Sequence, residues 1–195
     1  MKISLILAHP DKGSFNHAIA ETAFETLKQK GHELFYHDLY AERFDPILPG
    51  AEIAKDAAIP PQIEKYCREI SESEGIIIVH PNWWGQPPAI LKGWIDRVIR
   101  PGVAYEFLEG DPGEGIPRGL LPAKIAMVFN TSNTPYLREK EVFGDPLAVL
   151  WEKCVFELCG VSHFYRRMFG VIVTSFDEQR REWLDEVRES VGHYF

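Results

Sequence analysis

Apolar residues recur along this chain in two alternating patterns, short continuous runs and longer stretches with helical spacing. The first run covers residues 3–8 and indicates a buried strand. Residues 15–30 follow it with a helical pattern that ends at Gly31, a residue type that commonly follows helices. The apolar positions of this stretch share one helical face: Phe15, Ile19, Ala23 and Leu27. A strand followed by a helix is therefore the first predicted unit.

The same alternation continues to the end of the chain. Further strands are expected at residues 32–39, 76–79 and 124–129, with a fifth inside 161–173. The expected helices have apolar positions three and four residues apart and cover residues 60–73, 90–98, 145–158 and 177–191. Five strands that alternate with helices, without a repeat or a linker, predict one α/β domain over residues 1–195.

The connections of this domain restrict how its strands are ordered. Crossovers between parallel strands are right-handed, and the order 2-1-3-4-5 fits a five-stranded parallel sheet with helices on both faces. Its switch point lies between strands 1 and 3, where ligands bind beyond the carboxyl ends. We therefore expect residues 9–16 to lie beside residues 81–86.

Two segments interrupt the regular pattern. Residues 40–60 lack periodicity and contain three prolines, so we expect a surface excursion there. Residues 101–122 are rich in Gly and Pro and too long for a simple connector, which favours a functional loop. The alternative for the second segment is a loop that packs against another subunit, and one segment could serve both purposes.

The most informative stretch is residues 76–98, IIIVHPNWWGQPPAILKGWIDRV. Its four β-branched apolar residues predict a strand buried on both faces, and the loop after them contains Trp83 and Trp84. Such loops lie at the surface, where two adjacent tryptophans are costly unless they have a function. We therefore expect this loop to form the wall of a site for a flat aromatic ligand.

The first loop, HPDKGSFN at residues 9–16, joins strand 1 to the start of a helix. Free N–H groups and the positive end of the helix dipole favour a phosphate there, with Ser14 and Asn16 as further polar contacts. Equally, Ser14 could simply cap the helix. The loop contains neither GxGxxG nor GxxxxGK[ST], which disfavours a Rossmann dinucleotide loop and a P-loop.

The loop after strand 4 contains small polar residues: Asn130, Thr131, Ser132 and Asn133. They could hydrogen-bond the edge of a ring, although the same residue types are common in any turn. Together, the three strand-end loops would offer anion binding, an aromatic wall and a polar edge. A flavin nucleotide requires this combination.

Two histidines, His9 and His80, end the first and third strands. A histidine at such a position is more commonly a structural residue bonded to a loop carbonyl than a ligand contact. The pair resembles metal ligands if the strands are neighbours, but no carboxylate or cysteine cluster supports them. We therefore predict no metal site.

Composition narrows the class of partner and the compartment. A net charge of −8 makes nucleic acid an improbable partner. Cys67 and Cys154 fall on apolar faces of predicted helices, which indicates buried inert thiols, and with Cys159 they form no CxxC pair. No segment approaches the roughly 20 apolar residues of a membrane span, and the first residues lack a cleavage pattern. These features favour a cytoplasmic protein in a reducing compartment.

Four motifs resemble one protein family. They are LAHP-x3-SFN at residues 7–16, HDLY at 37–40, PPAILKGWIDRV at 87–98 and GDPLAVLW at 144–151. With these motifs the chain is similar, over nearly its full length, to the flavodoxin-like NAD(P)H:quinone oxidoreductases, which include DT-diaphorase and the ancillary reductases of bacterial potassium-efflux systems. The motif after the third strand is the most specific of the four.

The resemblance implies a flavin, FAD or FMN, in a homodimer whose active site lies at the subunit interface. The implied cofactor residues, together with those expected from the loops, are His9, Ser14, Phe15, Asn16, Pro81, Asn82, Trp83, Trp84, Gly85, Asn130, Thr131, Ser132 and Asn133. The family's aromatic lid positions over the substrate fall on Tyr105 and Phe107. The choice between FMN and FAD stays open, as does the choice between NADH and NADPH.

The chain departs from the family at positions that carry chemistry in DT-diaphorase. The histidine before the Gly-Asp pair is Phe143 here, and the nearby tyrosine falls on Leu137, with Tyr136 one residue away. The proton relay of that enzyme therefore does not carry over, and no catalytic side chain is assigned. The usual Gly-Gly of the fourth-strand loop is Ser132-Asn133.

The implied activity is a ping-pong reaction in which NAD(P)H reduces the flavin by hydride transfer and a quinone-type acceptor then takes two electrons. The flavin supplies the chemistry, while the protein orients the reactants. One alternative is a regulatory flavin-binding subunit of a potassium-efflux transporter, with residues 43–60 and 101–121 as contact surfaces. Another is a flavodoxin-type carrier of single electrons.

Overall fold

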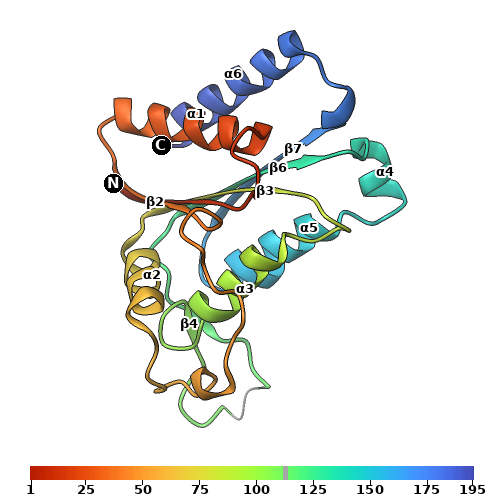
Figure 1. Cartoon of the computed structure of the whole chain (residues 1–195). Coiled ribbons are helices and arrows are strands. Elements are labelled where there is room, and N and C mark those ends of the chain that lie inside the picture. The colour runs from red at the N-terminus through yellow and green to blue at the C-terminus, as the bar shows by residue number, and fades with distance from the viewer. Residues whose placement is uncertain (112–113) are drawn as a thin grey trace.

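The chain forms a parallel five-stranded sheet with helices on both faces in a computed structural model that describes residues 1–111 and 114–195 (Figure 1). The strands of this sheet are β1 (Lys2–Leu7), β2 (Glu33–Asp38), β3 (Gly75–Pro81), β6 (Ile125–Ser132) and β7 (His163–Gly170). Their order, β2-β1-β3-β6-β7, confirms the predicted order 2-1-3-4-5.

The helices form two layers (Figure 1). One face of the sheet carries α1 (Phe15–Gln29) and α6 (Asp177–Tyr194), which pack against each other. The other face carries α2 (Pro61–Glu72), α3 (Ala89–Val98) and a helix that starts as α5 (Pro146–Ala148) and continues as η2 (Val149–Glu157). A short helix, α4 (Tyr136–Glu141), follows β6, and two 3-10 turns are η1 (Gly50–Glu52) and η3 (Ile172–Thr174).

Strand β3 is buried along its whole length because both faces of the central sheet are covered. Ile76 and Ile78 point into the core under α2 and α3, whereas Ile77 and Val79 point into the core under α1 and α6. Side chains alternate along a strand, so one apolar run serves two cores. The continuous apolar run in the sequence therefore predicted this strand correctly.

The helix after α4 corrects one prediction about the cysteines. Val149–Glu157 is a π-helix, in which hydrogen bonds join residues five apart, so its buried positions drift from those of an α-helix. Its buried side chains include Trp151 and Val155, and Cys154 is exposed. The expectation of a buried thiol was therefore wrong for Cys154 and right for Cys67.

Residues 40–60 are anchored more firmly than a surface excursion requires. The Arg97 guanidinium, on α3, donates from Nε and Nη2 to the Glu52 carboxylate at 3.1 and 2.7 Å, and both side chains are buried. Arg100 donates to the backbone oxygens of Glu52 and Ala54 at 3.0 and 2.9 Å. A buried, doubly bonded guanidinium therefore fastens this segment to the main body.

The predicted loop at residues 101–122 contains a small antiparallel pair, β4 (Tyr105–Glu106) and β5 (Arg118–Gly119), at the lower end of the molecule in Figure 1. Residues 112–113 of that loop lie outside the described residues. Nowhere in the described part of the chain is a helix both long enough and apolar enough to cross a bilayer.

Candidate functional site

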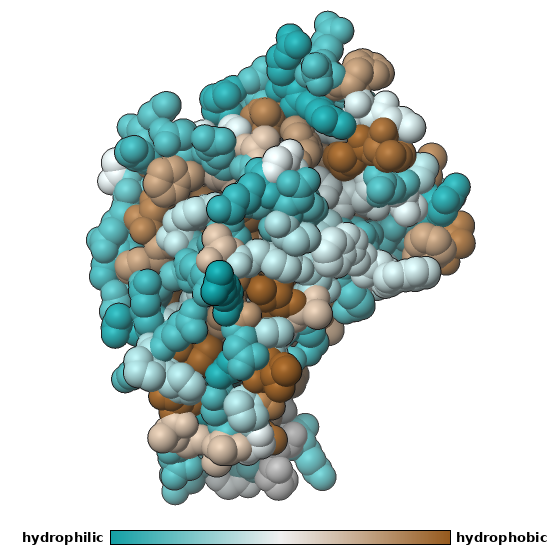
Figure 2. Space-filling model, viewed as in Figure 1, coloured by the Kyte–Doolittle hydropathy of each residue, from teal (hydrophilic) through white to brown (hydrophobic). Residues whose placement is uncertain are grey.

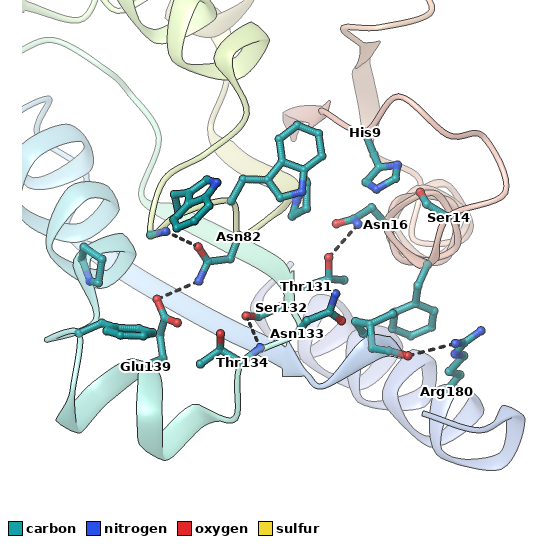
Figure 3. A pocket seen from close by; sticks show the side chains of 18 of the residues that line it. His9, Ser14, Asn16, Asn82, Thr131, Ser132, Asn133, Thr134, Glu139 and Arg180 are labelled. Atoms are coloured by element: carbon teal, nitrogen blue, oxygen red, sulfur yellow. Dashed lines mark hydrogen bonds between the residues drawn. The ribbon is translucent and has the colours of Figure 1, made fainter. Parts of the chain in front are cut away.

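The loops that follow β1, β3 and β6 meet at the carboxyl edge of the sheet and enclose a cavity of about 860 Å³ (Figure 3). Its wall includes every predicted cofactor residue except Asn130: His9, Ser14, Phe15, Asn16, Pro81, Asn82, Trp83, Trp84, Gly85, Thr131, Ser132 and Asn133. The predicted neighbourhood of residues 9–16 and 81–86 is thus realised, because β1 and β3 are adjacent parallel strands.

Asn130 does not line the cavity. Its side chain is fully buried, and its Oδ1 accepts a 2.9 Å hydrogen bond from Nε of Arg166 on β7. The next residue, Thr131, points the other way, as alternation along a strand requires, and its Oγ1 accepts from Asn16 Nδ2 at 2.9 Å. The sequence of four polar residues could not show which of them face the cavity.

Tyr105 and Phe107 also lie outside the set of residues that line the cavity. Tyr105 belongs to β4 and packs against the core, and Phe107 is 40% exposed. Their rings meet edge to face, with centroids 6.1 Å apart. A single chain therefore does not bring the two expected lid residues to its own cavity.

One end of the cavity is suited to an anion. Phe15 and Asn16 begin α1, and their backbone N–H groups have no hydrogen-bond partner among the described residues. Ser14 both caps this helix, accepting from His17 N–H at 3.4 Å, and lines the cavity, so the two expectations for Ser14 hold together. The positive end of the helix dipole faces this space.

Arg180, which the sequence reading missed, adds a positive charge to the wall of the cavity. It stands in the first turns of α6, and its guanidinium donates to Ser175 Oγ at 2.8 Å and to Ile172 O at 3.2 Å. Figure 3 shows Arg180 at one end of the cavity and Glu139 at the other. Its position in a charged helix, between residues that are mainly exposed, gave no signal of a role.

His9 contributes a neutral group beside the anion end. Its Nδ1 accepts a 3.1 Å bond from the Asp11 N–H, and its ring lies 6.3 Å from that of Trp83. Burial lowers the pKa of His9, the contact between its Nδ1 and the Asp11 carbonyl oxygen raises the pKa by less, and the nearby His17 lowers it further. The ring is therefore uncharged near neutral pH.

The tryptophan loop is a tight two-residue turn. Trp83 and Gln86 exchange two backbone hydrogen bonds of 3.0 Å, and φ is +57° at Trp84 and +71° at Gly85. Positive φ at both central positions is the mark of a type I′ turn, which prefers Asn-Gly. A side chain on Gly85 would come within 2.8 Å of Pro146, so glycine is required there. Trp84 is fully exposed.

The buried carboxylate of Glu139 supports this turn through the side chain of Asn82. Asn82 Oδ1 accepts from the Gly85 N–H at 2.9 Å, and Asn82 Nδ2 donates to Glu139 Oε1 at 2.8 Å (Figure 3). Glu139 is 1% exposed and lines the cavity. It lies in the charged sequence Arg-Glu-Lys-Glu, a pattern typical of a solvated face, so the sequence offered no reason to select it.

His80 is a structural residue. Trp151 Nε1–H donates to His80 Nε2 at 2.9 Å, and His80 Nδ1–H donates to Pro81 O at 2.8 Å. Burial lowers the pKa of His80 to about 4, with a further contribution from Arg166, so the imidazole is neutral. Within residues 1–111 and 114–195, no group of His, Cys, Asp and Glu side chains is arranged to hold a metal ion.

The residues at the family positions of the proton relay do not form one here. Phe143 lines the cavity as an apolar surface, and Tyr136 and Leu137 are exposed and lie outside its wall. Ser132 and Asn133, which replace the family's glycines, bond locally: Ser132 Oγ accepts from the Thr134 N–H and Asn133 Oδ1 from the Val173 N–H, each at 3.0 Å.

An unpaired polar atom tests whether these residues suit a flavin. Asn16 is 2% exposed and lines the cavity, and its Oδ1 has no hydrogen-bond partner among the described residues. Buried acceptors are ordinarily paired, so this oxygen calls for a hydroxyl or amide donor from a ligand. A sugar-alcohol chain between a phosphate and a ring offers such hydroxyls, and the residues present therefore fit a flavin nucleotide.

Comparisons with known proteins also point to a flavodoxin-like protein. A family model described as flavodoxin-like fold matches residues 1–191. An uncharacterised NAD(P)H oxidoreductase of Haemophilus influenzae is 33% identical over 188 residues, which cover 93% of this chain and 89% of that protein. NAD(P)H dehydrogenase [quinone] 1 of Cavia porcellus is 33% identical, over 75% of this chain and 59% of its own length.

The fold has close counterparts among solved structures. The crystal structure of Smu.1420 from Streptococcus mutans superposes with a TM-score of 0.85 at 31% identity, covering 99% of this chain and all of that one. The chain thus matches this structure and the Haemophilus influenzae relative over most of their length, and it spans about three fifths of the guinea-pig enzyme.

Proposed function

This chain belongs to the flavodoxin-like family of NAD(P)H oxidoreductases, and we propose that it is a flavin-dependent enzyme that reduces quinones or similar acceptors with NADH or NADPH. The main support for the proposal is the uneven distribution of charged and aromatic groups around the cavity. One end of the cavity offers unpaired N–H groups at the start of α1 and the Arg180 guanidinium, and Trp83, Trp84 and Phe143 add aromatic side chains to the wall. This arrangement suits a ligand with a phosphate at one end and an aromatic ring at the other.

The side chains have distinct tasks in this scheme. The N–H groups of Phe15 and Asn16, with Ser14 Oγ, face the phosphate, and Asn16 Oδ1 accepts from the hydroxylated chain. Trp83 and Trp84 bound the ring together with the loop at residues 131–133. A flavin held by these residues would supply two-electron chemistry between NAD(P)H and the acceptor, in the ping-pong order that we propose.

We further propose that the enzyme acts as a homodimer in which Tyr105 and Phe107 of one subunit cover the cavity of the other. Apolar side chains interrupt the hydrophilic surface at the lower end of the molecule (Figure 2), over residues 40–60 and the described residues of the segment 101–121. Its most exposed apolar residues are Ile47, Ile53, Leu108 and Ile116. A second copy would cover this surface. The unpaired cysteines support a cytoplasmic location.

Turnover with each cofactor pair tests the proposal. The purified protein is loaded with FMN or FAD, freed of excess flavin, and assayed for oxidation of NADH and NADPH with a soluble quinone. We expect flavin-dependent turnover with at least one pair. Asn16→Ala should weaken flavin binding roughly tenfold, the equivalent of about 1.4 kcal/mol. The control Gln29→Ala, at the exposed far end of the same helix, should bind flavin like the wild type.

Two results would contradict the proposal. The first is failure to bind either flavin. The second is a flavin-loaded protein that oxidises neither nicotinamide in the presence of a quinone.

A further inference from the structure

Three side chains form a hydrogen-bonded chain that ends at the anion end of the cavity. Ser14 Oγ lies 3.0 Å from His17 Nδ1, and His17 Nε2 lies 3.2 Å from Asp38 Oδ2. The His17 and Asp38 side chains are only 17% and 13% exposed. Ser14 lines the cavity, whereas His17 and Asp38 stand behind it. Asp38 belongs to the HDLY motif, whose role the cavity alone does not explain.

The carboxylate determines where the histidine carries its hydrogen. Asp38 Oδ1 accepts from the N–H groups of Tyr40 and Ala41, each at 3.1 Å, so its Oδ2 is left to face His17. An ionised carboxylate only accepts, and His17 Nε2 is therefore assigned as the protonated nitrogen. In neutral His17, Nδ1 must then be an acceptor. The Ser14 hydroxyl donates its hydrogen to that nitrogen.

This arrangement leaves Ser14 without a donor for the cavity. A hydroxyl has one hydrogen, and here His17 takes it, so the oxygen lone pairs would face an incoming phosphate. A second proton on His17 reverses the bond: Nδ1–H then donates to Ser14 Oγ, and the hydroxyl hydrogen is free to turn toward the cavity. The resulting imidazolium lies between the Asp38 carboxylate and the bound anion.

We propose that His17 and Asp38 are positioning residues that control the direction of the Ser14 hydroxyl, and that a phosphate-bearing flavin binds with uptake of one proton at His17. The inference rests on the proposed function, because it takes the anion to be the phosphate of a flavin nucleotide. The charged and titratable groups that face His17 are Asp38 on β2, the His9 ring 6.4 Å away and Glu21 one turn along α1.

Calorimetry with two ligands tests the proton uptake. FMN and riboflavin are titrated into the protein at pH 8 in buffers with different ionisation enthalpies. At this pH a phosphate monoester, whose second pKa is about 6, is already a dianion and binds no proton itself. We expect uptake approaching one proton with FMN and none with riboflavin, which lacks the phosphate. Affinity for FMN should rise as the pH falls.

The variant Asp38→Asn should abolish the proton uptake and at the same time strengthen FMN binding. Its amide oxygen can keep the bonds from Tyr40 and Ala41, which turns the NH2 group toward His17 Nε2 and moves the histidine hydrogen to Nδ1. Ser14 is then a donor without any proton uptake. We expect uptake to vanish and FMN affinity at pH 8 to rise several-fold. Glu21→Gln, which also removes a neighbouring negative charge, should keep the uptake.

His17→Gln provides a second variant should Asp38→Asn fold poorly, and it should likewise abolish the uptake. FMN binding without proton uptake in the wild type, or uptake that persists in His17→Gln, would overturn this inference while leaving the proposed function intact. Failure to bind both FMN and riboflavin would instead overturn the proposed function.

Discussion

At the scale of single residues, the wall of the cavity contains groups whose conformation or burial is unfavourable for the stability of the folded chain. Trp84 combines a left-handed backbone with full exposure, and Asn16 keeps a buried oxygen without a partner. Neither arrangement stabilises the folded chain by itself. Such features concentrate at sites where a ligand or partner compensates for them.

Trp84→Asn should therefore stabilise the ligand-free protein. Asparagine tolerates a positive φ, and Asn-Gly is the preferred pair of a type I′ turn. Because Trp84 is fully exposed, the substitution loses no packing within the chain. Urea denaturation should show a gain of about 1 kcal/mol in the free energy of unfolding, together with weaker flavin binding. A loss of stability would show that Trp84 packs in a way the exposed side chain does not indicate.

Glu139 should support the turn through its role as an acceptor. Glu139→Leu leaves the Asn82 amide unpaired and should cost about 1–3 kcal/mol of stability. It should also open the chain between residues 82 and 86 to limited proteolysis. Glu139→Gln retains an acceptor oxygen and should therefore keep most of the stability and most of the resistance to proteolysis. Glu141→Leu, at an exposed position on the same short helix, is the matched control. Equal behaviour of the Leu and Gln variants would contradict the role of the hydrogen bond.

At the scale of elements, the sequence predicted those whose burial follows a regular period. The runs in β1, β3 and β6 are apolar because both faces of the sheet are covered, and the right-handed connections between the strands then gave the strand order. The π-helix was not predictable, because residues 149–157 carry no pattern that departs from an α-helix. Glu139 and Arg180 were missed since charged side chains on helices mainly face solvent. Asn130 was misplaced because strand alternation depends on an unknown register.

The π-helix leads to a prediction about thiol reactivity. Cys154 is exposed, whereas burial raises the pKa of Cys67 to about 11 and that of Cys159 to about 12. A thiolate is the reactive form, so only Cys154 should react rapidly with a thiol reagent in the folded protein. We expect one fast thiol per chain, lost in Cys154→Ala, and three after unfolding. Two fast thiols in the folded wild type would contradict the burial pattern.

His80, near the end of β3, should make the free energy of unfolding depend on pH. The folded-state pKa of His80, about 4, lies below the ordinary value of 6.5, so the unfolded chain binds more protons between these values. The contribution of neutral His80 to the free energy of unfolding is complete above pH 6.5. It is lost as the pH falls toward 4, and the total loss is about 3 kcal/mol. His80→Gln, which can keep both hydrogen bonds, should flatten this part of the stability profile. An unchanged profile would contradict the assignment.

At the scale of the whole molecule, one chain supplies the wall of the cavity but not the two aromatic residues expected to cover it. The cavity has a positive end, aromatic side chains in its wall and a buried carboxylate at its far end, and the loops after β1, β3 and β6 supply most of its lining, with Arg180 from α6 and Glu139 from α4. Tyr105 and Phe107, the two expected lid residues, do not line this cavity. The sequence could specify the loops because topology brings them together, whereas the proposed lid would come from a second subunit, which a single chain does not contain.

A crystal structure of the protein grown with FMN would show whether the cavity holds a flavin nucleotide with its phosphate at the start of α1. We expect the phosphate against Ser14 and the N–H groups of Phe15 and Asn16, with the ring between the tryptophan turn and residues 131–133. A flavin bound with its phosphate toward Glu139, or outside this cavity altogether, would contradict the proposed binding mode.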